Sequence, residues 1–411
     1  MGSIPITRSK STSRPDLWPL VSREGVCSFL VGACVLIYVH KGGVMPRRLV
    51  PVLLATFLFS CGGPEANATT TPTPSPMTTP SPLSSPSPSP TGQLGPGGLT
   101  LSEEIGAVMM VGFRGSLTTA VLSDWKKRQF GGLLVVNLNH NATTAASMKS
   151  LIATIRATDR HRLIAATDQE GGQVCLAIST VPCDAMPVGK SGTTQMATAI
   201  KSLGFDLDLG PVSDVCNGPS SIMWGRCYGT NPTPVATAVG AVVDGIHAAQ
   251  MLSASKHFPG HGDTSVSSET QLPRINESLA TLESRDWPPF RAAISHGTDF
   301  ILLGHLYYPA IDTVHSADLS PVTIRMLRSN LGFKGAIISD DMEMGAITNS
   351  TPASEAAVEF LVNGGDMVMI AHDIAVADAT YNAIKAAVAS GRLPRSRLDQ
   401  AVAALQALPN R

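Results

Sequence analysis

The sequence predicts a (β/α)8 (TIM-like) barrel over residues 98–411, and three observations lead to that fold class. Eight short apolar runs alternate with amphipathic segments, which is typical of a parallel sheet covered on both faces. Polar residues follow the runs, as expected of strands that end at a barrel rim. The alternative is a doubly wound sheet, but no Gly-x-Gly-x-x-Gly loop follows an early run.

The predicted elements follow from hydrophobic periodicity. The apolar runs predict strands at 108–113, 132–138, 163–167, 205–211, 251–255, 299–304, 335–339 and 366–371. The amphipathic segments predict helices that include 145–158, 234–249, 279–296, 321–329, 354–362 and 376–390. The strand ends should carry Asn139, Asp168, Asp214, Lys256, His257, His305, Asp340, Asp341, His372 and Asp373 to one rim. We expect about a third of them to be structural hydrogen-bond partners.

Composition narrows the class of partner. Of the 411 residues, 43% are hydrophobic and 15% charged, which is enough apolar material for a large core. The net charge of −1 gives no indication of a nucleic-acid partner. Aromatic residues make up only 5%, so an extended stacking surface is not expected, although one or two rings suffice in a polysaccharide groove.

The N-terminal part reads as a targeting signal. Residues 45–61, MPRRLVPVLLATFLFSC, combine a basic start, an apolar run and a small residue before a cysteine. The ending resembles a bacterial lipobox, which implies lipidation of Cys61. The alternative is a short transmembrane anchor, but the run is too short to span comfortably. Residues 1–44 suggest an over-extended start, with translation beginning at Met45, or else a second anchor.

A spacer and four cysteines follow this signal. Residues 62–97 are rich in Pro, Ser and Thr, so we expect an extended linker that holds the domain at 98–411 off the membrane. The predicted location is extracytoplasmic, anchored to a bacterial membrane, and export permits disulfides. Cys175–Cys183 and Cys216–Cys227 are the short-loop pairings among three connectivities, and free thiols are the alternative.

Two motifs carry candidate chemistry. Residues 335–347, GAIISDDMEMGAI, bring Asp340 to the rim, where a carboxylate can attack an anomeric carbon. Alternation along a strand predicts that only one of Asp340 and Asp341 faces the pocket. Residues 253–264, SASKHFPGHGDT, place Lys256 and His257 directly after a strand. A zinc site of His257, His261 and Asp263 is disfavoured, since the proline and glycines of the motif prevent the helix that its spacing needs.

These motifs resemble glycoside hydrolase family 3, in the branch of bacterial β-N-acetylglucosaminidases that act on cell-wall fragments. KHFPGHG, the upstream DQEGG, GRCYG at 225–229 and SDDMEM carry the resemblance, which covers about 98–411. It implies a (β/α)8 barrel without metal or organic cofactor, working as a monomer on a carbohydrate substrate. The matching positions imply that Asp340 is the nucleophile. Asp168, Arg226, Lys256 and His257 would hold the sugar.

The sequence departs from this family's pattern in two places. The branch continues after KHFPGHG to Asp-Ser-His, whose His is the acid/base, but here Ser-Ser-Glu ends at Glu269. Glu269 is the first candidate acid/base, since a partly desolvated carboxyl group can keep its proton. Asp263 or another residue is the second reading, and a degraded, glycan-binding homologue is the third. The family's arginine after DQEGG is also missing, because Gln173 stands there.

Glu269 also bears on the acceptor. Some relatives transfer the sugar to phosphate, which a carboxylate would repel. The resemblance, with this substitution, therefore predicts a retaining exo-β-glycosidase that transfers terminal N-acetylglucosamine, or a related β-glycoside, to water.

Overall fold

The computed structural model describes residues 94–176, 178–183, 186 and 189–411. The predicted signal at 45–61, the lipidation site Cys61 and most of the linker at 62–97 lie outside the described residues. Within the described ranges, no helix combines the length and the apolar character needed to cross a membrane.

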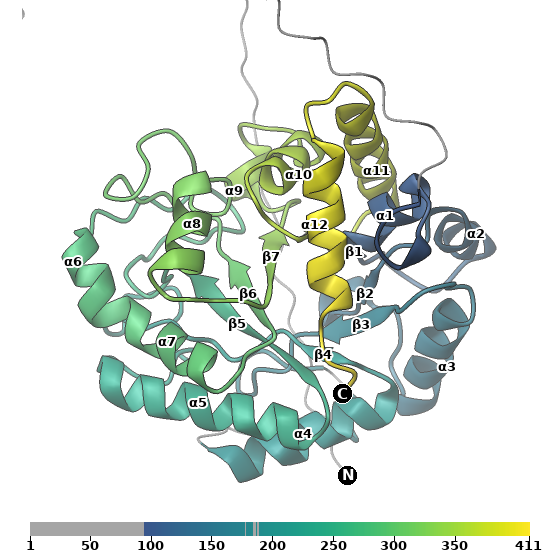
Figure 1. Cartoon of the computed structure of the whole chain (residues 1–411). Helices are drawn as coiled ribbons and strands as arrows, with labels where there is room; N and C mark the ends of the chain where they lie inside the picture. Colours follow the sequence, from purple (N-terminus) through teal and green to yellow (C-terminus); the bar gives the residue numbers. More distant parts are fainter. Residues whose placement is uncertain (1–93, 177, 184–185, 187–188) are drawn as a thin grey trace, which may run out of the picture. The chain divides into compact units, whose positions relative to one another are not determined.

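Eight parallel strands close into one barrel in chain order, with β1 pairing β8 (Figure 1). Each predicted apolar run coincides with one strand, although β5 and β7 extend beyond the ends of their runs, and the predicted fold class is confirmed. The strands are almost wholly buried, because helices cover their outer face and side chains fill the interior. Their bounds are β1 Met109–Val111, β2 Gly132–Leu134, β3 Ile164–Thr167, β4 Leu207–Asp208, β5 Leu252–Phe258, β6 Phe300–Leu303, β7 Ala336–Asp341 and β8 Met367–Ile370.

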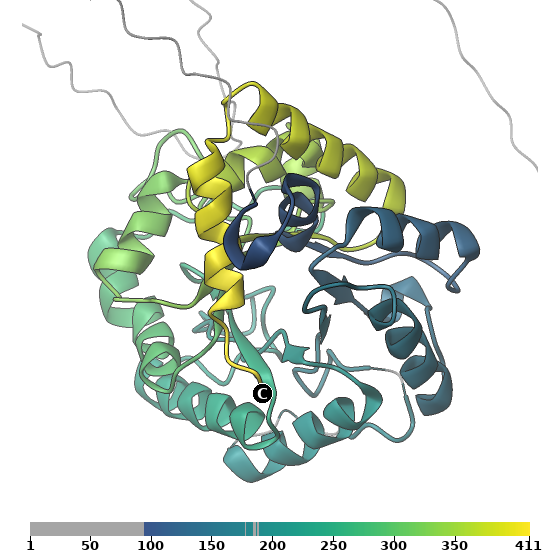
Figure 2. The ribbon, with the colours of Figure 1, turned by 45° about the vertical axis from the view of Figure 1, so that its right-hand side comes forward.

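Helices form the outer ring around the strands (Figure 2). Their starts follow local capping chemistry, as when Thr100 and Glu103 form a capping box at α1. Asn231 caps α5 ahead of Pro232, whose missing N–H costs nothing in the first turn. The helices are α1 Leu101–Ala107, α2 Thr119–Arg128, α3 Ala145–Arg156, α4 Lys190–Leu203, α5 Pro232–Ala248, α6 Leu279–Thr281, α7 Trp287–Ser295, α8 Pro321–Ser329, α9 Gly345–Thr348, α10 Ala353–Val362, α11 Ile374–Ala389 and α12 Arg395–Gln406.

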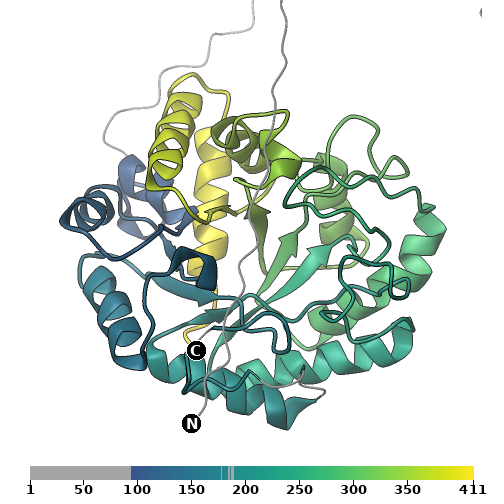
Figure 3. The same ribbon diagram turned by 180° about the vertical axis from the view of Figure 1, so that it is seen from behind.

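The predicted helix at 279–296 is interrupted in the structure. A π-helical stretch, Leu282–Asp286, separates α6 from α7. The residues Pro288 and Pro289 follow at the start of α7, and neither can donate the amide hydrogen bond of a continuous helix. Seen from behind, α4, α5 and α7 run along the outside of β4 to β6 (Figure 3). The longer strands of the barrel, β5 and β7, carry the residues of both motifs.

Candidate active site

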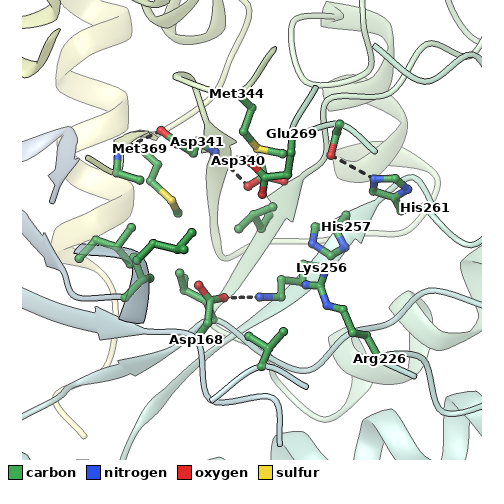
Figure 4. Close-up of a pocket in the computed structure, with 18 of the residues that line it drawn as sticks. Asp168, Arg226, Lys256, His257, His261, Glu269, Asp340, Asp341, Met344 and Met369 are labelled. Carbon is green, nitrogen blue, oxygen red and sulfur yellow. Dashed lines mark hydrogen bonds and ion pairs between the residues drawn. The ribbon is translucent and has the colours of Figure 1, made fainter. Parts of the chain in front are cut away.

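A cavity of about 410 Å³ opens at the carboxyl ends of the strands. Its floor is the barrel interior, where Leu134, Leu209 and Leu302 are buried. Around this floor stand all six predicted site residues of the barrel, namely Asp168, Arg226, Lys256, His257, Glu269 and Asp340 (Figure 4). A pocket with a closed floor can accept the end of a glycan chain.

An ion-pair cluster lies on one side of the cavity, where Asp168, Arg226 and Lys256 line the cavity and Glu170 lies behind them. Lys256 Nζ contacts Asp168 Oδ1 and lies 2.7 Å from Glu170 Oε1. Arg226 donates to both oxygens of Glu170, at 2.8 and 2.6 Å, in the bidentate geometry that arginine favours. Glu170 is 5% exposed, so this carboxylate anchors two cations beneath the cavity.

The electrostatics of the ion-pair cluster favour full ionisation. Burial would raise the pKa of Glu170, but Lys256 and Arg226 outweigh it and lower the pKa to about 2. Burial would likewise lower the pKa of Lys256, and Asp168 and Glu170 raise it instead. Glu170 and Lys256 therefore keep their charges across the physiological range, and the cluster presents Asp168, Arg226 and Lys256 to the cavity.

His257 is held by a carboxylate behind it. Its Nδ1 lies 2.8 Å from Asp214 Oδ2, and Asp214 Oδ1 accepts the backbone amide of His261 at 2.7 Å. Asp214 is fully buried, so it fixes the turn of the KHFPGHG motif. His261 Nε2 lies 3.2 Å from Ser268 Oγ. Burial lowers the pKa of His261 to about 4, so this ring is neutral near pH 7.

Asp340 and Asp341 end β7, and both line the cavity, so the prediction that only one faces it is wrong. The register of β7 against β8 shifts between Ile338 and Asp341, which breaks the alternation of side chains. Asp341 Oδ1 nevertheless accepts the amides of Glu343, at 3.1 Å, and Ala371, at 2.9 Å. Asp341 therefore has a structural role.

Asp340 is set up to remain ionised. Burial would raise its pKa, but the attraction of His257 and His305 and the amide of Asp341 outweigh it and lower the pKa. His305 is itself buried beside Asp318, 3.0 Å away. Burial opposes the charge of His305, but Asp318 raises its pKa to about 9. An ionised carboxylate with little competing hydrogen bonding is suited to nucleophilic attack.

Glu269 lies close to Asp340 (Figure 4). Desolvation and then the negative charge of Asp340 raise the pKa of Glu269. Its carboxyl group makes no hydrogen bond or ion pair with any residue that the structure describes. Two carboxyl groups in one cavity thus have pKa values displaced in opposite directions, which is the pattern of an acid and a nucleophile.

Asp263, the alternative acid/base, does not line the cavity. Its Oδ1 accepts from Asn217 at 2.5 Å, and its Oδ2 lies 3.6 Å from Arg285. The structure therefore disfavours Asp263 as acid/base, and also the arrangement of His257, His261 and Asp263 around a zinc ion. Within the described ranges, no group of three or more His, Cys, Asp or Glu side chains is arranged to hold a metal ion.

Both short-loop disulfides are present. Cys175–Cys183 borders the cavity, since Cys175 is one of its lining residues. Cys216–Cys227 ties the segment after β4 to the loop that carries Arg226. Export of the barrel to an oxidising compartment is compatible with these bonds.

Sequence reasoning singled out the residues that line the cavity and missed the charged residues behind them. Glu170 lies inside the DQEGG motif and was not singled out, although it anchors two predicted sugar contacts. Asp208, at the end of β4, is buried beneath the same cluster and was also missed. A charged residue inside a glycine-rich motif was the available signal for Glu170.

Comparisons with known proteins agree with this geometry. A β-hexosaminidase from Nitrosomonas eutropha is 30% identical over 295 residues, which is 66% of this chain and 83% of the relative. A second, from Stenotrophomonas maltophilia, is 28% identical over 291 residues, 67% of this chain and 86% of the relative.

A solved structure of a glycoside hydrolase family 3 β-N-acetylglucosaminidase from a Paenibacillus species superposes with a TM-score of 0.71 at 30% identity. The match covers 75% of this chain and 62% of that protein. Residues 100–408 match the model of the glycosyl hydrolase family 3 N-terminal domain. Because that match spans most of the chain, the protein belongs to glycosyl hydrolase family 3.

Proposed function

We propose that this glycoside hydrolase is a retaining, exo-acting β-glycosidase that removes terminal β-N-acetylglucosamine from cell-wall or chitin-type fragments. The observation that supports this function most strongly is the pair of carboxyl groups, Asp340 and Glu269, which line one cavity and have pKa values displaced in opposite directions. The β-hexosaminidase relatives and the Paenibacillus β-N-acetylglucosaminidase support the choice of sugar.

In the first step, an Asp340 carboxylate oxygen attacks the anomeric carbon of the terminal sugar. The bond from that carbon to the glycosidic oxygen breaks, and Glu269 gives its proton to the departing oxygen. The products are a glycosyl ester on Asp340, an ionised Glu269 and a free aglycone alcohol. The lowered pKa of Asp340 and the raised pKa of Glu269 match these opposite starting states.

In the second step, Glu269 removes a proton from water as the water oxygen attacks the same anomeric carbon. The ester bond to Asp340 breaks, so the nucleophile returns as a carboxylate and Glu269 regains its proton. The two inversions give net retention. Asp168, Arg226, Lys256 and His257 would hold the sugar hydroxyls throughout, because they line the cavity around its floor.

Hydrolysis of a chromogenic β-N-acetylglucosaminide by the purified protein tests this function, beside an Asp340→Asn control. We expect activity in the wild type and a loss of at least about 10⁴-fold in the control, since the nucleophile is gone. Failure on this substrate and on a panel of other β-glycosides, together with measurable glycan binding, would instead favour a catalytically degraded glycan-binding protein.

We further propose water, and not phosphate, as the acceptor. An ionised Glu269 beside the anomeric carbon repels a phosphate anion in the second step. Turnover should therefore be the same in phosphate and in an uncharged buffer at equal ionic strength. Faster turnover in phosphate, with a sugar phosphate as product, would contradict this assignment.

The N-terminal sequence supports a proposed lipoprotein form, with Cys61 lipidated and residues 62–97 as a spacer outside the cytoplasmic membrane. The division into 1–61, 62–97 and 98–411 and a monomeric state belong to the same proposal. Membrane fractionation of a bacterium that expresses the wild type and Cys61→Ala tests it. We expect the variant to leave the membrane fraction, and equal membrane association of both would contradict lipid anchoring.

A further inference from the structure

The segment that follows the nucleophile also holds the loop that carries Glu269. We call residues 263–270 the Glu269 loop. Two backbone amides at the start of α9 donate to it: Gly345 N to the carbonyl of Glu269 at 2.9 Å, and Ala346 N to that of Ser268 at 3.0 Å. Asn349, at the end of α9, donates its side-chain amide to the carbonyl of Thr270 at 2.8 Å.

These contacts satisfy groups that would otherwise lack partners. The first amides of a helix have no acceptor within it, and Gly345 and Ala346 are the first residues of α9. The loop carbonyls of Ser268 and Glu269 accept these amides. Ser268 and Ala346 are both buried, so separating the Glu269 loop from α9 would leave a buried donor and a buried acceptor unpaired, which opposes displacement of the loop.

Close approach of the two backbones depends on the absence of a side chain at Gly345. A Cβ at this position would lie 2.6 Å from the carbonyl oxygen of Thr270 and 2.8 Å from that of Glu269. Both separations are too short for real atoms, and both partners are backbone, so the loop would have to move. Gly345 thus permits an approach that no larger residue allows.

We propose that Gly345 and Asn349 are positioning residues that set Glu269 against Asp340. Segment 340–349 carries the nucleophile at one end and grips the Glu269 loop at the other. Because one segment both carries Asp340 and holds the Glu269 loop, it sets the separation of the two carboxyl groups, which is about 5–5.5 Å in retaining glycosidases. This inference rests on the proposed function, in which Glu269 is the acid/base.

The test compares two substrates that differ in their need for a general acid. 2,4-Dinitrophenyl β-N-acetylglucosaminide has a leaving group that departs without a proton, whereas the N-acetylglucosamine disaccharide needs one. For Gly345→Ala, we expect kcat/KM for the disaccharide to fall about 10²-fold, the cost of misplacing a catalytic group by about 1 Å. For Asn349→Ala, we expect a fall of up to about tenfold. The aryl glycoside should lose far less in both variants.

Matched controls separate positioning from general destabilisation. Gly245→Ala, on α5, would bring a Cβ within 2.6 Å of Thr193 Cβ and 2.8 Å of the Lys190 carbonyl oxygen, far from the site. Asn363→Ala removes a comparable bond, 2.7 Å to the Leu319 carbonyl oxygen. In both controls, any change should affect the two substrates in equal proportion at matched melting temperatures.

A Glu269→Gln reference keeps the two proposals distinguishable. If Glu269→Gln shows the substrate difference but Gly345→Ala and Asn349→Ala affect both substrates equally, the positioning inference is wrong and the proposed function stands. If Glu269→Gln shows no substrate difference, the acid/base assignment itself fails. If Gly345→Ala does not fold, the result for Asn349→Ala alone tests the positioning inference.

Discussion

The two sides of the cavity differ in how their charges are paired. On the binding side, Asp168, Glu170, Arg226 and Lys256 form a cluster of two carboxylates and two cations in mutual contact. On the reaction side, neither Asp340 nor Glu269 forms an ion pair with any residue that the structure describes. Both sides stand at the same rim, so the difference lies in the local partners and not in the fold.

This difference matches two kinds of work. Paired charges stay ionised and stay in place, which suits recognition of sugar hydroxyls with little rearrangement on binding. Unpaired carboxyl groups respond to burial and to each other, so one can hold a proton while the other loses it. The pKa values of Asp340 and Glu269 are displaced in the directions that the two steps require.

Among the changes that compare the two sides, neutralising the acid on the reaction side should have the largest effect. In Glu269→Gln, kcat/KM for the disaccharide should fall about 10²- to 10⁴-fold, because the leaving oxygen receives no proton. The raised pKa of Glu269 places the basic limb of the wild-type pH profile above its ordinary value of 4.5. Glutamine cannot ionise, so that limb should vanish. Persistence of the limb in the variant would assign it to another group.

Breaking the binding side should instead affect stability and KM together. Glu170→Gln leaves Arg226 and Lys256 buried with one counter-charge fewer, which should lower the free energy of unfolding by roughly 3 kcal/mol and raise KM about tenfold. The pKa of Glu170 is lowered in the folded state, so its stabilisation is present above pH ~4.3 and is lost as pH falls through about 2.

Denaturant unfolding at several pH values, beside steady-state kinetics, measures these effects. Glu355→Gln is the control, because its ion pair with Arg392 is exposed and should contribute less than ~1 kcal/mol. Equal losses of unfolding free energy in Glu170→Gln and Glu355→Gln would show that the buried ion-pair cluster contributes no more to stability than an exposed ion pair.

The smallest expected effect concerns Asp208, which is buried beneath the ion-pair cluster on the binding side. Burial raises the pKa of Asp208 to about 8, so this carboxyl group is protonated in the folded protein near neutral pH. Because its folded pKa exceeds its unfolded value, stability falls as pH rises from ~4 through about 8. Asp208→Asn mimics the protonated group and keeps an acceptor for the amide of Gln169.

The variant should therefore be more stable than the wild type at pH 8, by ~1 kcal/mol or more, with a smaller gain at pH 5. Melting temperatures across this range check the sign. A variant that loses more stability at pH 8 than at pH 5 would show that Asp208 is ionised in the folded protein.

The sequence predicted the barrel well, because hydrophobic runs and their polar ends follow directly from burial on both faces of a parallel sheet. Motif spacing also brought Asp340 and Glu269 to one cavity. It could not predict the register shift in β7, which depends on pairing with β8 and lets Asp341 line the cavity as well. It also missed Glu170, since a buried counter-ion is recognised by its contacts and not by its position in a motif.

Covalent trapping on the reaction side tests the central claim most directly. Glu269→Gln treated with 2,4-dinitrophenyl β-N-acetylglucosaminide should complete the first step, because the leaving group needs no proton. It should stall in the second, because no base activates water. Mass spectrometry of the digested protein should then find one N-acetylglucosaminyl group on the peptide that contains Asp340. A sugar attached to a different residue would contradict the pairing of Asp340 and Glu269. So would a variant that turns over the substrate at the wild-type rate and forms no adduct.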